Sequence, residues 1–268
     1  MPDPIVTLTT DFGTSDHFVG VMKGVILGIA PRARIVDITH DVAPFEVTGG
    51  AFAISQAWSY FPKGTIHIVV VDPGVGSARR PLLVQTMGHY FIAPDNGVLS
   101  MVYSRMIHRR ETHRVRHITA DRYFRKPVSR TFHGRDIFSP VAAHLATGVT
   151  PARFGKLIQD HVRLTLDQPV QTGKRTWTGA VLHVDRFGNL ITNFHMDAFA
   201  SVTTRPFEID VGFEKLNRLV QMFSEGSAGE LLVLIGSSGF LEVAANQASA
   251  AKLLGCGAGS PVELTLYP

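Results

Sequence analysis

The first half of the chain alternates short apolar runs with longer amphipathic segments. The runs Ile5 to Thr10, Arg34 to Thr39 and Thr65 to Val71 are predicted strands, and the last is almost wholly apolar, as expected of a strand buried on both faces. Helices are predicted between these strands, from about His17 to Ala30 and from Thr48 to Tyr60. Strands that alternate with helices build a mostly parallel sheet with helical crossovers, so the pattern predicts an α/β domain.

Shorter signals complete this half of the chain. Pro81 to Gln85 and Tyr90 to Ala93 are predicted strands, and the tripeptide Asp95-Asn96-Gly97 after them is a turn signal. A last helix is predicted from Asp136 to Ala146 with Asp136 as its cap, and Asp16 is predicted to cap the first helix. These signals extend the predicted sheet and end the domain on a helix.

The second half of the chain shows short strands separated by turns. Six strands are predicted, at Gly179 to Val184, Asn189 to Phe194, Pro206 to Val211, Leu231 to Ile235, Phe240 to Ala244 and Pro261 to Tyr267. A series of short strands without a long helix is typical of a small β-sandwich or barrel. With the boundary placed near residue 170, we expect an α/β domain over residues 1–168 and an all-β domain over residues 169–268.

Composition limits the class of protein. Apolar residues make up 45% of the 268 residues and charged residues only 18%, against roughly 25% charged residues in soluble domains. A large core or an oligomeric interface accounts for such a balance. The single cysteine, Cys256, excludes an intramolecular disulfide and favours a reducing compartment. No signal peptide and no apolar run of the ~18 residues that a membrane span needs are seen, so a cytoplasmic protein is expected.

The net charge of +4 raises the question of a nucleic-acid partner. Ten of the 26 lysines and arginines lie between Arg105 and Arg135, together with the aromatic residues Tyr123, Phe124 and Phe132. The segment carries no known nucleic-acid-binding motif, so we interpret it as a solvated basic loop and expect no nucleic acid as partner. A basic nucleotide-binding module is the alternative that this segment leaves open.

Aspartates end three of the predicted strands. Asp11, Asp41 and Asp72 stand at carboxyl ends, where open α/β sheets bind their ligands. The alternative is that each caps the following helix or turn. Asp11 is favoured as a site residue because a turn of mostly small residues follows it, whereas Asp41 is interpreted as structural or as a partner of His40.

The glycine-rich loop from Asp72 to Arg79 does not match a nucleotide-binding motif. Arg79 stands where a dinucleotide loop has its third glycine, and a predicted strand follows instead of a helix. The segment Gly236 to Gly239 is not a nucleophile elbow either, because its glycines are wrongly spaced around the serines. His133, just ahead of the last predicted helix, becomes a candidate only if the sheet brings it near Asp72 and Arg79.

Several of these residues could also bind a metal ion. The hard-metal ligands available near the strand ends are Asp11, His40, Asp41, Asp72 and His133. The sequence contains neither HExxH nor HxH, and one cysteine cannot build a thiolate cluster. We therefore expect no metal, and a metal-dependent phosphoesterase stays as an alternative function.

Six segments, read together, resemble a known family. They are Thr9 to Gly13, Val71 to Gly76 with Arg79, Ile92 to Gly97, Phe132 to Asp136, Asp185 to Asn189 with Thr192 and Asn193, and Ser237 to Phe240. In this order they resemble the S-adenosyl-L-methionine hydrolases (adenosine-forming), also called SAM hydroxide adenosyltransferases, which are related to the fluorinases and chlorinases. The resemblance covers the whole chain.

The resemblance implies an N-terminal α/β domain, a C-terminal β-barrel and a homotrimer with sites between neighbouring subunits. It implies that Asp72, Arg79 and His133 position and activate water, with S-adenosyl-L-methionine as substrate and no cofactor. It also implies substrate contacts from Asp11 to the ribose hydroxyls, from Asp185 and Ser237 to the methionine end, and from Phe187, Asn189 and Phe223 to the nucleoside. Phe45 stands where the fluorinases carry a tryptophan near the ribose.

The sequence differs from the halogenases at the positions expected to surround the nucleophile. The halogenases carry a tyrosine where Asp72 stands, and a tyrosine and a halide-binding serine where His133 and Gly134 stand. A carboxylate beside the nucleophile repels an anion, so the comparison favours water over halide, with a halogenase as the alternative. His133 can act as the base because the ordinary histidine pKa of about 6.5 suits neutral pH, and Asp72 is the other candidate.

Overall fold

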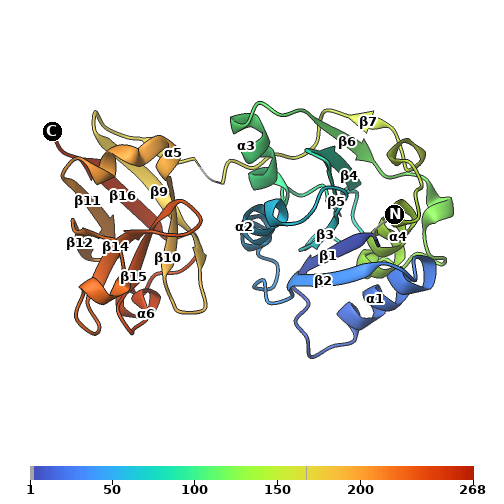
Figure 1. Ribbon diagram of the computed structural model, residues 1–268, viewed down its shortest axis with the longest axis horizontal. Coiled ribbons are helices and arrows are strands. Elements are labelled where there is room, and N and C mark those ends of the chain that lie inside the picture. The colour runs from blue at the N-terminus through green and yellow to red at the C-terminus, as the bar shows by residue number, and fades with distance from the viewer. Residues whose placement is uncertain (1–2, 167) are drawn as a thin grey trace. The chain divides into compact units, whose positions relative to one another are not determined.

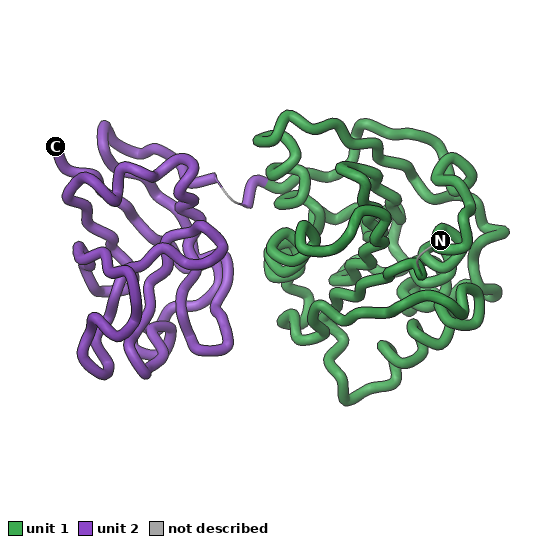
Figure 2. Tube along the Cα trace, in the orientation of Figure 1, with its two compact units in different colours: residues 1–164 green, residues 165–268 purple. Residues whose placement is uncertain are grey.

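The computed structural model describes residues 3–166 and 168–268 (Figure 1). The chain divides into two compact units, residues 1–164 and residues 165–268 (Figure 2). The sequence predicted a boundary near residue 170. None of the helices in the described residues is long and apolar enough to cross a membrane.

The first unit is built on a seven-stranded sheet. Its strands, in spatial order, are β2 (Arg34–Thr39), β1 (Ile5–Thr10), β3 (Ile66–Val70), β5 (His89–Pro94), β4 (Pro81–Thr86), β6 (His113–His117) and β7 (Leu157–Ile158). The strands from β2 to β5 are parallel, and the strands from β4 to β7 add antiparallel pairs. The predicted α/β domain is confirmed, and its sheet is mixed because a short turn joins β4 to β5 as an antiparallel hairpin, and β6 and β7 extend the sheet with antiparallel pairs.

Helices cover both faces of this sheet (Figure 1). They are α1 (Phe18–Ile29), α2 (Val47–Ala57), α3 (Ser100–His108) and α4 (Ser139–Ala146). Helices α1 and α4 pack into one core with Ile68 of β3, and α2 and α3 pack into another with Val69 of the same strand. Successive residues of a strand point to opposite faces of the sheet. The continuous apolar sequence of β3 therefore contributes side chains to both cores, as predicted for a strand buried on both faces.

The second unit contains a nine-stranded sheet that curls into a half-barrel (Figure 1). Its strands are β8 (Val170–Gln171), β9 (Thr176–Val184), β10 (Leu190–His195), β11 (Phe207–Val211), β12 (Glu214–Leu216), β13 (Leu219–Val220), β14 (Leu231–Ile235), β15 (Phe240–Ala245) and β16 (Pro261–Leu266). Its two short helices are α5 (Met196–Phe199) and α6 (Ala250–Leu254). All six predicted strands are present, so the all-β prediction is confirmed.

Several single turns connect the longer elements. The 3-10 turns are Trp58–Tyr60, Asp121–Tyr123, Pro151–Arg153, Ala200–Thr203 and Phe223–Glu225, and a π-helical turn spans Gly134–Phe138. The predicted cap at Asp16 is wrong. Helix α1 begins one residue later than the predicted start, with His17 at its N-cap and no side-chain hydrogen bond there.

Candidate functional site

Asp72, Arg79 and His133 meet beyond the carboxyl end of β3. Asp72 and Arg79 belong to the loop between β3 and β4, and His133 precedes the π-helical turn. Nε of Arg79 donates to Oδ1 of Asp72 over 3.0 Å, and Nη2 of Arg79 donates to Oδ2. The same Nη2 lies 2.7 Å from Nδ1 of His133. The Asp72 and Arg79 side chains are only 4% and 8% exposed, and with the half-buried His133 they form a charge-assisted cluster.

The contact with Arg79 fixes the protonation of His133. A guanidinium can only donate, so Nδ1 of His133 accepts and the neutral ring carries its proton on Nε2. Burial lowers the pKa of His133 most, and the charge of Arg79 lowers it further, against an opposing effect of Asp72. The ring is therefore neutral at neutral pH and presents an N–H donor on its Nε2 side.

One nitrogen of Arg79 has no partner. Nη1 is buried and makes no hydrogen bond to any of the residues that the structure describes. The Phe138 ring, whose centroid lies 5.3 Å from Cζ, packs against the guanidinium. A buried donor left unpaired costs free energy, so this nitrogen is suited to hold a water molecule or a polar ligand atom.

The two loops of the cluster touch at Gly76. Gly76 has a φ of 76°, and a Cβ built there would lie 2.2 Å from the carbonyl oxygen of Arg130. Only glycine allows the Asp72 loop to approach the segment before His133 this closely. The close approach sets the distance between Arg79 and His133.

The buried carboxylate of Asp136 anchors the segment before His133. Asp136 is fully buried, accepts the backbone N–H of Ser129 over 2.8 Å, and accepts from Nε and Nη2 of Arg135 over 2.7 and 2.8 Å. Burial acts to raise the pKa of Asp136, but Arg135 and the Ser129 N–H outweigh burial and hold it below its usual value. The prediction that Asp136 caps α4 is wrong, because the π-helical turn carries its side chain into the core, and α4 has no side-chain cap.

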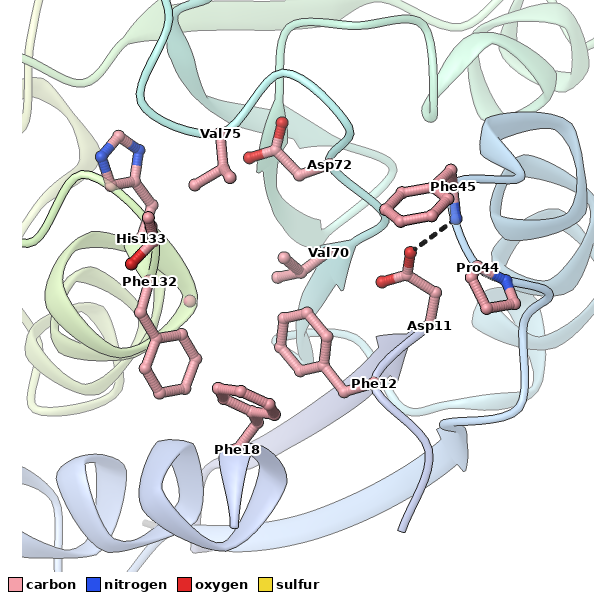
Figure 3. A pocket seen from close by; sticks show the side chains of 12 residues that line it. Asp11, Phe12, Phe18, Pro44, Phe45, Val70, Asp72, Val75, Phe132 and His133 are labelled. Atoms are coloured by element: carbon pink, nitrogen blue, oxygen red, sulfur yellow. Dashed lines mark hydrogen bonds between the residues drawn. The ribbon is translucent and has the colours of Figure 1, made fainter. Parts of the chain in front are cut away.

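A cavity of about 290 Å³ adjoins the cluster (Figure 3). Asp72 and His133 line one side of it, and Asp11 and Phe45 line another. Oδ2 of Asp11 accepts the backbone N–H of Phe45 over 2.9 Å, and Phe45 has a φ of 70° and a ring that is 71% exposed. The remaining lining is mainly apolar and comes from Phe12, Phe18, Pro44, Val70, Val75 and Phe132, with Thr131 and Gly134. An apolar pocket with a few convergent polar groups is typical of small-molecule sites.

His40 has a different partner from the one predicted. Its Nδ1 lies 2.8 Å from Oγ1 of Thr10, and its Nε2 lies 3.0 Å from Oδ1 of Asp37. Asp41 is exposed, and its backbone N–H donates to Thr39. Of the two interpretations of Asp41, the pairing with His40 is therefore wrong, because Asp37, three residues before His40, supplies the carboxylate. Among the residues described, no group of three or more histidines, cysteines and acids is arranged to hold a metal ion.

In the second unit, three of the predicted nucleoside residues line a second cavity, of about 510 Å³. They are Phe187, Asn189 and Phe223, and Ala245, Gln247 and Ala248 complete its lining. The Asp185 carboxylate organises the turn that carries two of them. It accepts the backbone N–H groups of Phe187 and Asn189, each over 2.9 Å, and the side-chain amide of Asn189 over 2.8 Å.

Ser237 lies in the tight turn between β14 and β15. Its side chain is exposed, and the turn is closed by the backbone N–H of Gly236, which donates to the Phe240 carbonyl over 2.9 Å. Glu242, an acid for which no role was predicted from the sequence, is buried just beyond this turn. The signal was present in the sequence, since Glu242 is the one charged residue in the apolar run from Phe240 to Ala245.

Several arginines of the basic segment make contacts inside the first unit. Nη1 of Arg116 donates to the Gly155 carbonyl over 3.0 Å, and Nη2 of Arg105 donates to Gln56 over 2.8 Å. Arg125 and Arg135 both approach Asp136. These four side chains support the fold rather than forming one continuous solvated face.

Comparison with known proteins covers both units. Residues 6–155 match the sequence profile of the SAM hydroxide adenosyltransferase N-terminal domain, and residues 179–263 match that of the C-terminal domain of the same family. A protein of Methanocaldococcus jannaschii named (R)-S-adenosyl-L-methionine hydrolase is 36% identical over 261 residues, which cover 93% of this chain and 91% of that protein.

Two further similarities concern the fold and the related halogenases. An uncharacterised conserved protein of Thermotoga maritima, whose crystal structure is known, superposes with a TM-score of 0.87 at 38% identity, over 97% of this chain and 99% of that one. A fluorinase of Actinoplanes sp. is 28% identical over 98% of both chains. The hydrolase is thus more similar to this chain than the fluorinase is.

Proposed function

This chain belongs to the SAM hydroxide adenosyltransferase family, and on that premise we propose that it hydrolyses S-adenosyl-L-methionine to adenosine and L-methionine with Asp72, Arg79 and His133. The observation that carries the proposal is the hydrogen-bonded cluster of these three side chains beside the first cavity. The cluster holds an unpaired donor on Arg79 and an N–H on His133, and both suit the oxygen of a water molecule.

The reaction depends on positioning of the nucleophile rather than on a general acid. The sulfonium makes the departing methionine a neutral thioether, so the leaving group needs no proton. The protein has to place water in line with the bond between C5′ and sulfur and to accept a proton from it. Positioning of this kind contributes up to ~7–11 kcal/mol in ideal intramolecular cases.

The protonation of His133 bears on which residue accepts the proton. Because Nδ1 of His133 accepts from Arg79, its Nε2 donates to the water oxygen and cannot take a proton from it. Asp72 is then the acceptor, since a carboxylate offers about four lone-pair sites and Arg79 uses two of them. Arg79 stabilises the negative charge that develops on the oxygen.

The substrate contacts follow the two cavities. Asp11 would bind the ribose hydroxyls with the oxygen that Phe45 leaves free, and Phe45 would cover the ribose. Phe187, Asn189 and Phe223 would hold the nucleoside, and Asp185 and Ser237 would lie at the methionine end. From the resemblance to the family, we further propose a homotrimer whose sites form between neighbouring subunits. The enzyme works without a cofactor and in the cytoplasm.

Incubation with S-adenosyl-L-methionine in H₂¹⁸O tests the reaction. We expect adenosine and methionine in equal amounts, with the label in the 5′-hydroxyl of adenosine. Label in another product, or no adenosine at all, would refute attack of water at C5′.

A halogenase is the second candidate because a fluorinase is also similar to this chain. The negative charge of Asp72 beside the nucleophile favours neutral water over halide. A parallel incubation with chloride or fluoride is expected to yield no 5′-halo-deoxyadenosine. A metal-dependent phosphoesterase would lose its activity on exhaustive chelation, whereas this reaction is expected to continue unchanged.

A further inference from the structure

Glu242 lies on the half-barrel near residues assigned to the substrate. It lies on β15 opposite Ile191 of β10, which lies opposite His183 of β9. Residues directly opposite each other on neighbouring strands point to the same face, so these three side chains share a face. Asp185 and Asn189 belong to the turn that joins β9 and β10 next to them.

The Glu242 carboxylate reaches the turn that carries Ser237. A Cβ built on Gly236 would lie 1.6 Å from Oε1 of Glu242, so this oxygen occupies the space that any other residue would fill with a side chain. Gly236 directly precedes Ser237. Glu242 therefore contacts the turn that carries Ser237, and it lies near enough to Asp185 for the charge of Asp185 to act on it.

The Glu242 carboxylate is buried. Glu242 is 9% exposed, and its side chain forms no hydrogen bond or ion pair with the residues that the structure describes. Burial, followed by the negative charge of Asp185, raises the pKa of Glu242 to about 7. Two ionised carboxylates close together in a buried place are unfavourable unless one takes up a proton or a cation joins them.

Asp185 alone cannot provide the acceptor sites that a bound cation would need. Both of its oxygens accept hydrogen bonds within its own turn. Glu242 thus supplies a carboxylate whose acceptor sites are free. The pair combines a fixed negative charge with an unpaired acceptor, which suits a small cation with several N–H donors.

We propose that Glu242 binds the α-ammonium group of the methionine part of the substrate, an inference that rests on the proposed hydrolysis of S-adenosyl-L-methionine. The substrate has two cationic groups, and only the ammonium has N–H bonds to donate. The sulfonium must lie at the reacting carbon, on the side of Asp72. Glu242 therefore selects sulfonium nucleosides that carry an amino acid and holds the leaving methionine in line.

Glu242→Gln tests this assignment, with Glu263→Gln as matched control. Glu263 is an exposed glutamate on β16 of the same sheet. We expect Glu242→Gln to raise KM for S-adenosyl-L-methionine roughly tenfold or more, as for a lost charge-assisted hydrogen bond, with kcat nearly unchanged. For the analogue that lacks the α-amino group, the variant and the wild type should have the same KM. Glu263→Gln should match the wild type with both substrates.

Equal losses with both substrates would overturn the inference, since a merely structural role does not distinguish them. If the amide variant folds poorly, Glu242→Asp retains the charge and should still prefer the substrate with the amino group. Equilibrium dialysis of L-methionine against its desamino analogue provides a second measurement without turnover. If the wild type releases no adenosine, the proposed function fails, whereas equal binding of the two ligands by wild type and Glu242→Gln refutes only the role of Glu242.

Discussion

Arg79 donates to Nδ1 of His133 over 2.7 Å, and this contact decides which nitrogen of the imidazole faces the nucleophile as a donor. The assignment separates two mechanisms that the residue types alone leave open. If His133 only donates a hydrogen bond to the water, a side-chain amide that donates from the same position should substitute for it. If His133 is the general base, no amide can substitute for it.

His133→Gln and His133→Ala together test this distinction. We expect the alanine variant to lose ~10²–10³-fold in kcat, the range seen when one positioned hydrogen-bond donor is removed. The glutamine variant should recover much of this loss, because its amide can both accept from Arg79 and donate to water. Steady-state rates of adenosine release provide the measurement. Equal inactivity of the two variants would instead identify His133 as the base.

The same contact predicts a loss of activity in acid. Since burial and Arg79 lower the pKa of His133 below 6.5, the rate should be constant around neutral pH and fall only below that value, where the imidazolium repels Arg79. In His133→Gln this fall should disappear. An unchanged profile in the variant would assign the fall to another group.

Gly76→Ala should uncouple the two catalytic loops. The new methyl group would meet the Arg130 carbonyl at 2.2 Å, in addition to the strain of a positive φ. Gly64→Ala is the matched control, because Gly64 has a φ of 91° and open space around its Cβ position. We expect both variants to lose stability in thermal unfolding, and Gly76→Ala to lose a further ~1–3 kcal/mol together with most of its activity. Equal losses in the two variants would mean that the contact with Arg130 is relaxed at little cost.

Arg80 is expected to position its neighbour Arg79. Nε of Arg80 donates to Oδ2 of Asp95 over 2.8 Å, and Nη1 donates to Asp160 over 2.9 Å, which holds the end of the catalytic loop against the sheet. Arg80→Ala should therefore lower kcat about tenfold, the cost of a small misplacement, with a smaller change in KM. Arg32→Ala removes an exposed ion pair with Asp3 and should leave both constants unchanged. A change confined to the melting temperature would show that Arg80 acts on stability alone.

Three strands were predictable to the residue. The predicted ranges of β1, β2 and β14 coincide with those observed, because each is rich in the residues that favour extended backbone. Helix α3 and strand β6 were missed. Their buried side chains stand among arginines and histidines, so neither sequence shows a clean period, and packing on the sheet decides the conformation.

Hydrogen-bond partners that lie far apart in the chain could not be predicted from the sequence. Asp136 precedes a helix and was interpreted as its cap, but it binds Ser129, seven residues earlier, from inside the core. The predicted proximity of Asp72, Arg79 and His133 was conditional on the sheet, and the structure brings them together. Their order along the chain indicated the right strand end. The contacts that orient them depend on Gly76 and on Phe138, whose roles no local pattern reveals.

His67 predicts how the stability of the fold depends on pH. It is fully buried on β3, where Nδ1 lies 2.8 Å from Oγ1 of Thr7 and the ring stacks on Phe91. Burial, with a smaller effect of His89, lowers the pKa of His67 to about 3. Below the unfolded pKa of about 6.5, His67 is protonated in the unfolded chain but stays neutral in the native state. The free energy of unfolding should therefore fall as pH drops from about 6.5 towards 3, by up to ~1.4 kcal/mol per pH unit. Denaturant unfolding of wild type and His67→Phe between these values measures the slope, which should be shallower in the variant whatever its absolute stability, and identical slopes would show that His67 becomes protonated within the native state.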